Sequence, residues 1–215
     1  MNKYLKNLIS EGEHQTQDFK YAINDSAKIA RSLAAFANTD GGRLLIGVKD
    51  NGKINGVVTD EEYYMVEAAA SLYCKPEVIF TTKTYSWEKK TVLEVFVPKS
   101  SNGPHKAPAK DGKYKAYVRV KDQNILANKI LLKVWARKKR KDGTFLKLTK
   151  AENSLLQYLN ENDSISLPQF RKLAKINRWH AEKIIVNLLV IDIIEIELSE
   201  NSCRYKLKKK SEFQL

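Results

Sequence analysis

One segment near the N-terminus limits the possible folds more than any other part of the chain. Residues 24–26 read Asn-Asp-Ser, which favour a helix N-cap, and apolar residues follow at helical spacing through Ala37. Residues 38–42, Asn-Thr-Asp-Gly-Gly, end that helix because glycine tolerates the left-handed exit. Residues 44–48 then predict a buried strand, and the Asn-Gly dipeptide at 51–52 predicts a hairpin turn back along 54–58. The segment therefore predicts a domain that mixes helices and strands.

Further elements follow as far as residue 143. Hydrophobic spacing predicts a helix from about residue 60 to 73, strands at 78–85, 91–97 and 114–120, and a helix at 123–137. Residues 98–113 hold three of the five prolines and predict a long loop, which in a compact domain often has a function. A basic run at 137–143 ends in a turn, so we place a domain boundary after it and expect a first domain at 1–143.

Residues 144–215 follow a different pattern. Thr149 begins a capping box, Pro168 lies in the first turn of a second short helix, and Asn177 begins a third. Residues 193–198 and 203–207 then alternate like the two strands of a hairpin. Three short helices followed by a hairpin is the order of a winged helix-turn-helix domain. We therefore expect an α+β chain whose second domain, 144–215, is of this type.

Charge is concentrated in the middle of the chain. The net charge is +13 and the pI is near 9.5, but residues 99–147 alone hold 15 basic and three acidic residues, a net charge of +12. A basic cluster is typical of proteins that bind a polyanion such as nucleic acid. A solvated basic face, or docking on an acidic protein, gives the same pattern, and both stay open.

Several classes of protein are disfavoured. Two cysteines, Cys74 and Cys203, are too few for a disulfide framework or a zinc site. No run approaches the ~18 apolar residues of a membrane span, and the first residues lack the apolar stretch of a signal peptide. We expect a cytoplasmic protein with no membrane partner.

The third helix of the second domain is the first candidate for nucleic-acid contact. In a helix-turn-helix this helix enters the major groove. Arg178 can donate two hydrogen bonds to guanine, Asn177 can pair with adenine, and Lys183 follows one turn later. Three lysines of the hairpin would hold phosphates: Lys206, Lys208 and Lys209. The alternative is a winged helix used for protein contacts or dimerisation.

The loop at 98–113 and the strand after it are the second candidate. They interleave lysine, arginine and tyrosine, a mixture that suits phosphate contact and base stacking. The residues expected to contact phosphates are Lys106, Lys110, Lys113, Lys115 and Arg119. A mobile loop beside an edge strand protected by lysines would look the same.

Three acidic residues, Glu13, Asp18 and Asp50, are candidates for a metal site. Acids that bind Mg²⁺ or Mn²⁺ together can activate water against a phosphodiester. Glu13 and Asp18 are five residues apart, so on one straight strand they would point to opposite faces. They can converge only if a turn or bulge intervenes.

Two stretches resemble a known family. Glu13-x4-Asp18-Phe19-Lys20 and residues 35–52, which begin Ala-Phe-Ala-Asn-Thr-Asp-Gly-Gly, are similar to the Schlafen AlbA_2 domain, as is Tyr-Val-Arg-Val at 117–120. The resemblance implies a small α/β sandwich that binds nucleic acid. Prokaryotic members with an appended winged helix imply a transcriptional regulator. We therefore predict a DNA-binding regulator that needs no cofactor, with RNA as another possible ligand.

The same resemblance implies an alternative activity. In Schlafen ribonucleases three metal-binding acids occupy the positions of Glu13, Asp18 and Asp50, although Asp18 replaces a glutamate and reaches one methylene less far. Those enzymes pair two such lobes, so this chain would need a homodimer to form a comparable groove. The alternative is thus an endoribonuclease that uses Mg²⁺ or Mn²⁺ to cut structured RNA.

Overall fold

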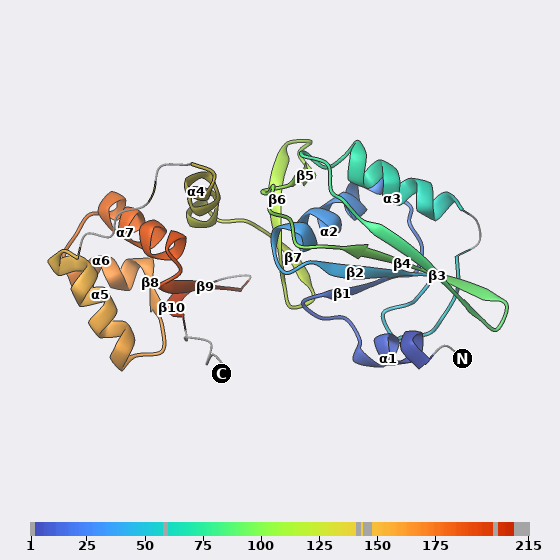
Figure 1. The fold of residues 1–215 in the computed structure, drawn as a ribbon, viewed down its shortest axis with the longest axis horizontal. Coiled ribbons are helices and arrows are strands. Elements are labelled where there is room, and N and C mark those ends of the chain that lie inside the picture. Colours follow the sequence, from blue (N-terminus) through green and yellow to red (C-terminus); the bar gives the residue numbers. More distant parts are fainter. Residues whose placement is uncertain (1–2, 58–59, 141–142, 144–147, 200–201, 209–215) are drawn as a thin grey trace. The chain divides into compact units, whose positions relative to one another are not determined.

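The computed structural model describes residues 3–57, 60–140, 143, 148–199 and 202–208 (Figure 1). The chain divides into two compact units: unit 1 ends at Ala127 and unit 2 begins at Asn128. Helices and several sheets occur together, so the expected α+β class is confirmed. No described helix is both long and apolar enough to cross a membrane.

Unit 1 is built on two sheets. The larger has the strand order β1-β2-β4-β3, in which β1 and β2 are parallel and the other pairs antiparallel. The smaller is antiparallel, with the order β5-β6-β7. The strands are β1 (Gln17–Lys20), β2 (Gly42–Ile46), β3 (Thr81–Trp87), β4 (Lys90–Val97), β5 (Lys106–Pro108), β6 (Tyr114–Val120) and β7 (Gln123–Leu126).

Helices cover both faces of the larger sheet. They are α1 (Lys3–Glu11), α2 (Ser26–Asn38) and α3 (Glu61–Ser71). Side chains alternate between the faces of a strand, so Leu44 packs in the core beneath α2 while Leu45 packs on the other face with Leu5 and Leu8 of α1. Helix α2 also packs on β5 and β6, which places it between the two sheets.

The glycine pair after α2 makes close packing possible. Gly41 has a φ of +75°, which glycine adopts without strain, and its N–H donates to Phe36 O at 2.9 Å. A Cβ at Gly42 would lie 2.3 Å from the Phe36 ring. The chain can therefore turn directly from α2 into β2, as the sequence predicts.

Unit 2 contains four helices and a small sheet among its described residues. The helices are α4 (Lys129–Lys138), α5 (Lys150–Glu161), α6 (Leu167–Ala174) and α7 (Arg178–Val190). The strands β8 (Ile165–Ser166), β9 (Ile194–Leu198) and β10 (Cys203–Leu207) pair in the order β8-β10-β9. The capping box at Thr149 is present as expected. Helix α7 carries much of the core, and α4 packs on it through Ile130 and Val134.

Three predicted elements differ from the structure. Within the loop expected at 98–113, Lys106–Pro108 forms β5, which pairs with β6. Residues 123–126 form β7 rather than the start of a helix, because they pair with β6, and the helix begins only after Asn128, whose side chain caps Leu131 N at 2.9 Å. The strand at 44–48 was expected to pair with 54–58. Instead β2 pairs with β1 and β4, and Val48 and Ile54 form an isolated bridge. Residues 58 and 59 lie outside the described residues.

The division between the two compact units falls after Ala127, earlier in the chain than the boundary expected after residue 143. Helix α4 lies in unit 2 because Ile130 and Val134 join its core. Part of the basic run before the expected boundary, residues 141–142, lies outside the described residues.

Candidate nucleic-acid interface

Glu13 and Asp18 lie together at the start of β1. A tight turn separates them, closed by His14 N donating to Gln17 O at 3.0 Å and by the reverse bond at 3.2 Å. Glu13 Oε1 then accepts from Phe19 N at 2.8 Å, and its carboxyl group is hydrogen-bonded to that of Asp18. Residues five apart on one straight strand would point to opposite faces, and this turn is what allows the two carboxyl groups to converge.

Two cations hold the Asp18 carboxylate from the other side. Lys20 Nζ lies 2.7 Å from Asp18 Oδ2, and Arg119 Nη2 lies 3.4 Å from Oδ1. Arg119 Nη2 also donates to Gln17 O at 3.1 Å, and its guanidinium group lies 5.1 Å from the centre of the Phe36 ring. Arg119 is only 2% exposed. The expectation that Arg119 contacts a phosphate therefore needs correction: on this strand its side chain points inward and joins β6 to β1.

The two carboxyl groups have opposite pKa shifts. Burial, and then the hydrogen bond to Asp18, raise the pKa of Glu13 to about 7. Burial also pushes the pKa of Asp18 upward, but the hydrogen bond from Glu13 and the charges of Lys20 and Arg119 outweigh it and lower that pKa. The raised pKa of Glu13 and the lowered pKa of Asp18 therefore favour a proton on Glu13 over one on Asp18.

A divalent metal ion does not fit these acids as they are arranged. The Asp18 carboxylate already contacts two cations, Lys20 at 2.7 Å and Arg119 at 3.4 Å. Asp50 is exposed in the turn after Val48 and is not part of the pair. Within the described part of the chain, no three His, Cys, Asp or Glu residues come together as metal ligands. The structure therefore brings two of the three expected acids together, and the metal site stays a prediction from the sequence.

Exposed lysines gather on the smaller sheet of unit 1 and the turn beside it. Lys106, Lys110 and Lys113 are exposed, whereas Lys115 is partly buried and pairs with Asp111 at 2.9 Å. The sequence pattern gave no signal for Lys75, whose backbone forms a bridge with Lys106 through two hydrogen bonds of 2.8 Å. The Lys75 ammonium group lies 4.4 Å from the centre of the Tyr114 ring, so a cation and an aromatic ring adjoin at this edge of the smaller sheet.

The start of α7 is less free to read bases than expected. Asn177 caps the helix, its Oδ1 accepting from His180 N at 2.9 Å, so that oxygen is not available for adenine. Arg178 Nε lies 2.7 Å from Oε1 of Glu182, one helical turn later. The buried Glu182 also pairs with Lys133 of α4 at 2.5 Å. Both residues predicted to contact bases are therefore engaged within the helix.

A basic groove lies between α4 and α7. Its volume is about 560 Å³, and its lining residues are Lys133, Ala136, Arg137, Arg140, Trp179, Lys183, Val186 and Asn187. Trp179 is 61% exposed, and Lys183 Nζ lies 5.2 Å from the centre of its ring. The lining holds four cations and no acid. The residues from α4 were not expected here, because the sequence places that helix before the expected domain boundary, and Trp179 had no expected contact of its own.

The comparisons with known proteins identify the family of unit 1. The family model "Schlafen, AlbA_2" matches residues 13–128, more than half of the chain. The chain therefore belongs to the Schlafen AlbA_2 family. A search of the curated proteins finds no match.

Two solved structures are similar at low identity. The DIP2311 protein from Corynebacterium diphtheriae is 16% identical with a TM-score of 0.45; the match covers 73% of this chain and 33% of that one. The N-terminal domain of a RecG-related protein from Nitrosomonas europaea is 22% identical with a TM-score of 0.40, covering 58% and 95%. This chain thus spans about a third of the length of the DIP2311 protein.

Proposed function

We propose that this chain is a nucleic-acid-binding protein that regulates transcription by binding DNA, with unit 2 as its winged helix-turn-helix domain. One observation carries the proposal: an exposed tryptophan stands in a groove lined by four cations and no acid. Cations match the phosphates of nucleic acid, and an exposed aromatic ring offers a flat contact for bases or sugars.

The order of elements in unit 2 supports this domain type. Helices α5, α6 and α7 precede the strands β9 and β10, and β8 adds to the sheet. Three residues, 175–177, separate α6 from α7, and Lys175 takes a left-handed conformation with φ of 51°. A turn of three to four residues between two helices is the helix-turn-helix arrangement.

On α7, the residues proposed to contact DNA are Trp179 and Lys183, in place of Asn177, which caps the helix. These two residues are exposed, while seven residues of α7 are buried. Further contacts to phosphates would come from three lysines of unit 1, Lys106, Lys110 and Lys113. In unit 2 they would come from Lys206 in β10 and from Lys208 directly after it. Lys209 lies outside the described residues. The homodimer stays a prediction from the sequence.

Fluorescence anisotropy with labelled duplex DNA and structured RNA over a range of salt concentrations tests the proposal. We expect steep salt dependence, and we expect Lys183→Gln to weaken binding and reduce the logarithmic salt slope by about 0.9. Lys28→Gln, which removes an exposed charge at the start of α2, is the matched control and should change neither. Binding that ignores salt, or equal effects of the two substitutions, would contradict the proposal.

The ribonuclease alternative stays a prediction from the sequence, with Glu13 and Asp18 together and no cluster of three metal ligands among the described residues. Incubating the RNA with and without Mn²⁺ in the same experiment checks this point. We expect the anisotropy to rise without cleavage of the RNA, and a denaturing gel of the same samples detects any cleavage. Cleavage that depends on Mn²⁺ and disappears in Asp50→Ala would support the ribonuclease alternative.

A further inference from the structure

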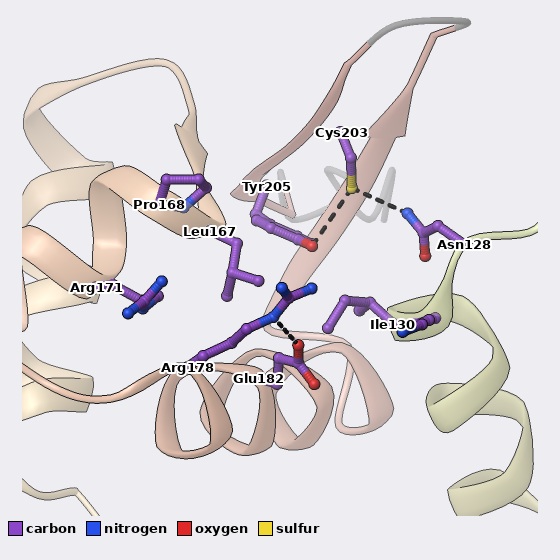
Figure 2. A pocket seen from close by; sticks show the side chains of 10 residues that line it. Asn128, Ile130, Leu167, Pro168, Arg171, Arg178, Glu182, Cys203 and Tyr205 are labelled. Carbon is purple, nitrogen blue, oxygen red and sulfur yellow. Dashed lines mark hydrogen bonds and ion pairs between the residues drawn. The ribbon is translucent and has the colours of Figure 1, made fainter.

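A second pocket opens in unit 2 beside the start of α7. It has a volume of about 410 Å³, within the range of small-molecule sites. Residues from α4, α6, α7 and β10 line it, together with Asn128 at the start of α4 (Figure 2). The pocket is separate from the groove that holds Trp179, although Arg178 and Trp179 are neighbours in the chain.

The lining combines cations with apolar walls. Arg171, Arg178 and Lys129 are the cations, and Glu182 is the single acid among the lining residues. Ile130, Leu167, Pro168 and the Tyr205 ring provide apolar surface. Figure 2 shows the Arg178 guanidinium group amid the pocket, with Glu182 on one side and the Tyr205 hydroxyl on the other.

The acid in the pocket is already neutralised. Glu182 accepts from Lys133 at 2.5 Å and from Arg178 at 2.7 Å, and these hydrogen bonds lower its pKa. Lys133 lies outside the pocket lining, so it can keep Glu182 neutralised if Arg178 turns toward another anion. Arg171 is exposed and makes no ion pair within the described part of the chain. The pocket therefore has spare positive charge.

We propose that this pocket binds a small organic anion with an apolar body. Its carboxylate or phosphate would contact Arg171 and Arg178, and its body would pack on Ile130, Leu167 and Tyr205. A guanidinium group favours such anions because it donates parallel hydrogen bonds. The apolar walls distinguish this ligand from a nucleic-acid backbone, whose phosphates and sugars are contacted through cations and polar groups.

Binding would affect α7 directly, and this step rests on the proposed function. Arg178 is the first residue of α7 and precedes Trp179. A ligand that draws Arg178 away from Glu182 changes the charge presented at the start of that helix. The pocket is thus an effector site, whose occupancy alters affinity for DNA.

Isothermal titration calorimetry of the full chain tests ligand binding without any DNA. The probes are phenylacetate, octanoate and phenyl phosphate, with phenylacetamide as the neutral counterpart of phenylacetate. We expect at least one of the anions to bind and the amide not to bind. Binding of none of the three anions, or equal binding of phenylacetate and phenylacetamide, would overturn the proposal.

Two substitutions with opposite expected effects locate the site. Arg171→Gln removes an exposed cation of the pocket, and we expect about tenfold weaker binding of the anion, as for loss of one charge-assisted hydrogen bond. Glu182→Gln removes the competing carboxylate, and we expect tighter binding. Lys28→Gln is the control in unit 1 and should have no effect. Circular dichroism checks that each variant folds. Equal affinities in all the variants would overturn this assignment.

Anisotropy with labelled DNA, in the presence of the anion that binds, then tests the effector role. We expect the DNA affinity to change in the natural chain and to change less in Arg171→Gln. Anion binding that leaves the DNA affinity unchanged would overturn the effector role and keep the pocket. Failure of the protein to bind DNA at all would instead contradict the proposed function, while calorimetry still decides the pocket.

Discussion

Arg119 and Asp18 form an ion pair in the interior of unit 1, with Nη2 and Oδ1 3.4 Å apart. The two residues are 101 positions apart in the chain and lie on β6 and β1. Their pairing connects the smaller sheet to the larger one. From the sequence, Arg119 was expected to contact a phosphate and Asp18 a metal ion. In the structure the two side chains contact each other and stabilise the fold.

Replacing Arg119 with alanine should destabilise unit 1. The substitution leaves the carboxylate of Asp18 buried with one cation fewer, a change that typically costs about 3–5 kcal/mol. Urea unfolding followed by circular dichroism measures the loss. Lys113→Ala, an exposed control on the turn before β6, should stay within about 0.5 kcal/mol. An Arg119→Ala protein of undiminished stability that fails only to bind nucleic acid would restore the surface role.

Glu13 should make unit 1 less stable as the pH rises. Its pKa is about 7 in the folded chain against an ordinary value of 4.5 for an exposed glutamate, so the folded state binds the proton more tightly. Stability is therefore highest below about pH 4.5 for this group and is lost as the pH rises through about 7. Asp18 acts in the opposite direction, at pH values near and below 3.8, because its pKa is lowered.

The variant Glu13→Gln isolates this effect. Glutamine stays neutral and keeps an oxygen that can accept from Phe19 N. We expect the variant to gain stability relative to the natural chain between pH 5 and pH 8, measured by thermal unfolding. A difference between the two proteins that stays constant over this range would contradict the raised pKa.

Ile130 and Leu132 on α4 should respond differently to truncation. Ile130 is 5% exposed and belongs to the unit 2 core, whereas Leu132 is 39% exposed. Ile130→Ala should cost about 2–5 kcal/mol, because it leaves a cavity. Leu132→Ala should cost far less. Denaturant unfolding of the two variants measures the difference, and equal losses would argue against α4 as a part of unit 2.

The lysines of the smaller sheet should contribute to affinity without adding sequence preference. Replacing Lys106, Lys110 and Lys113 together by glutamine should weaken binding to different DNA sequences by the same factor. The logarithmic salt slope should fall by about 2.7, if each lysine neutralises one phosphate. The control replaces three exposed lysines elsewhere in unit 1: Lys28, Lys53 and Lys83. If both triple variants lose the same affinity, the lysines of the smaller sheet do not form a binding surface for nucleic acid.

The sequence by itself determined the elements that depend on near neighbours. Asp25 caps α2 by accepting from Ala27 N at 2.8 Å, and the glycine pair ends that helix, both as predicted. The capping box at Thr149 was equally visible. In each case the interacting groups are only a few residues apart, so the pattern of residues contains the whole interaction. The family resemblance depended on the same segment and is confirmed by the match over residues 13–128.

Only the tertiary structure decided which other element packs against each face of a helix or strand. The strand at 114–120 was predicted, but alternation alone does not say that Arg119 points toward Asp18 instead of solvent. The apolar spacing of α4 predicted a helix, yet not that it would pack on α7. The physical reason is the same for both: burial and ion pairing depend on groups that are distant in sequence, and chain folding alone brings these groups together.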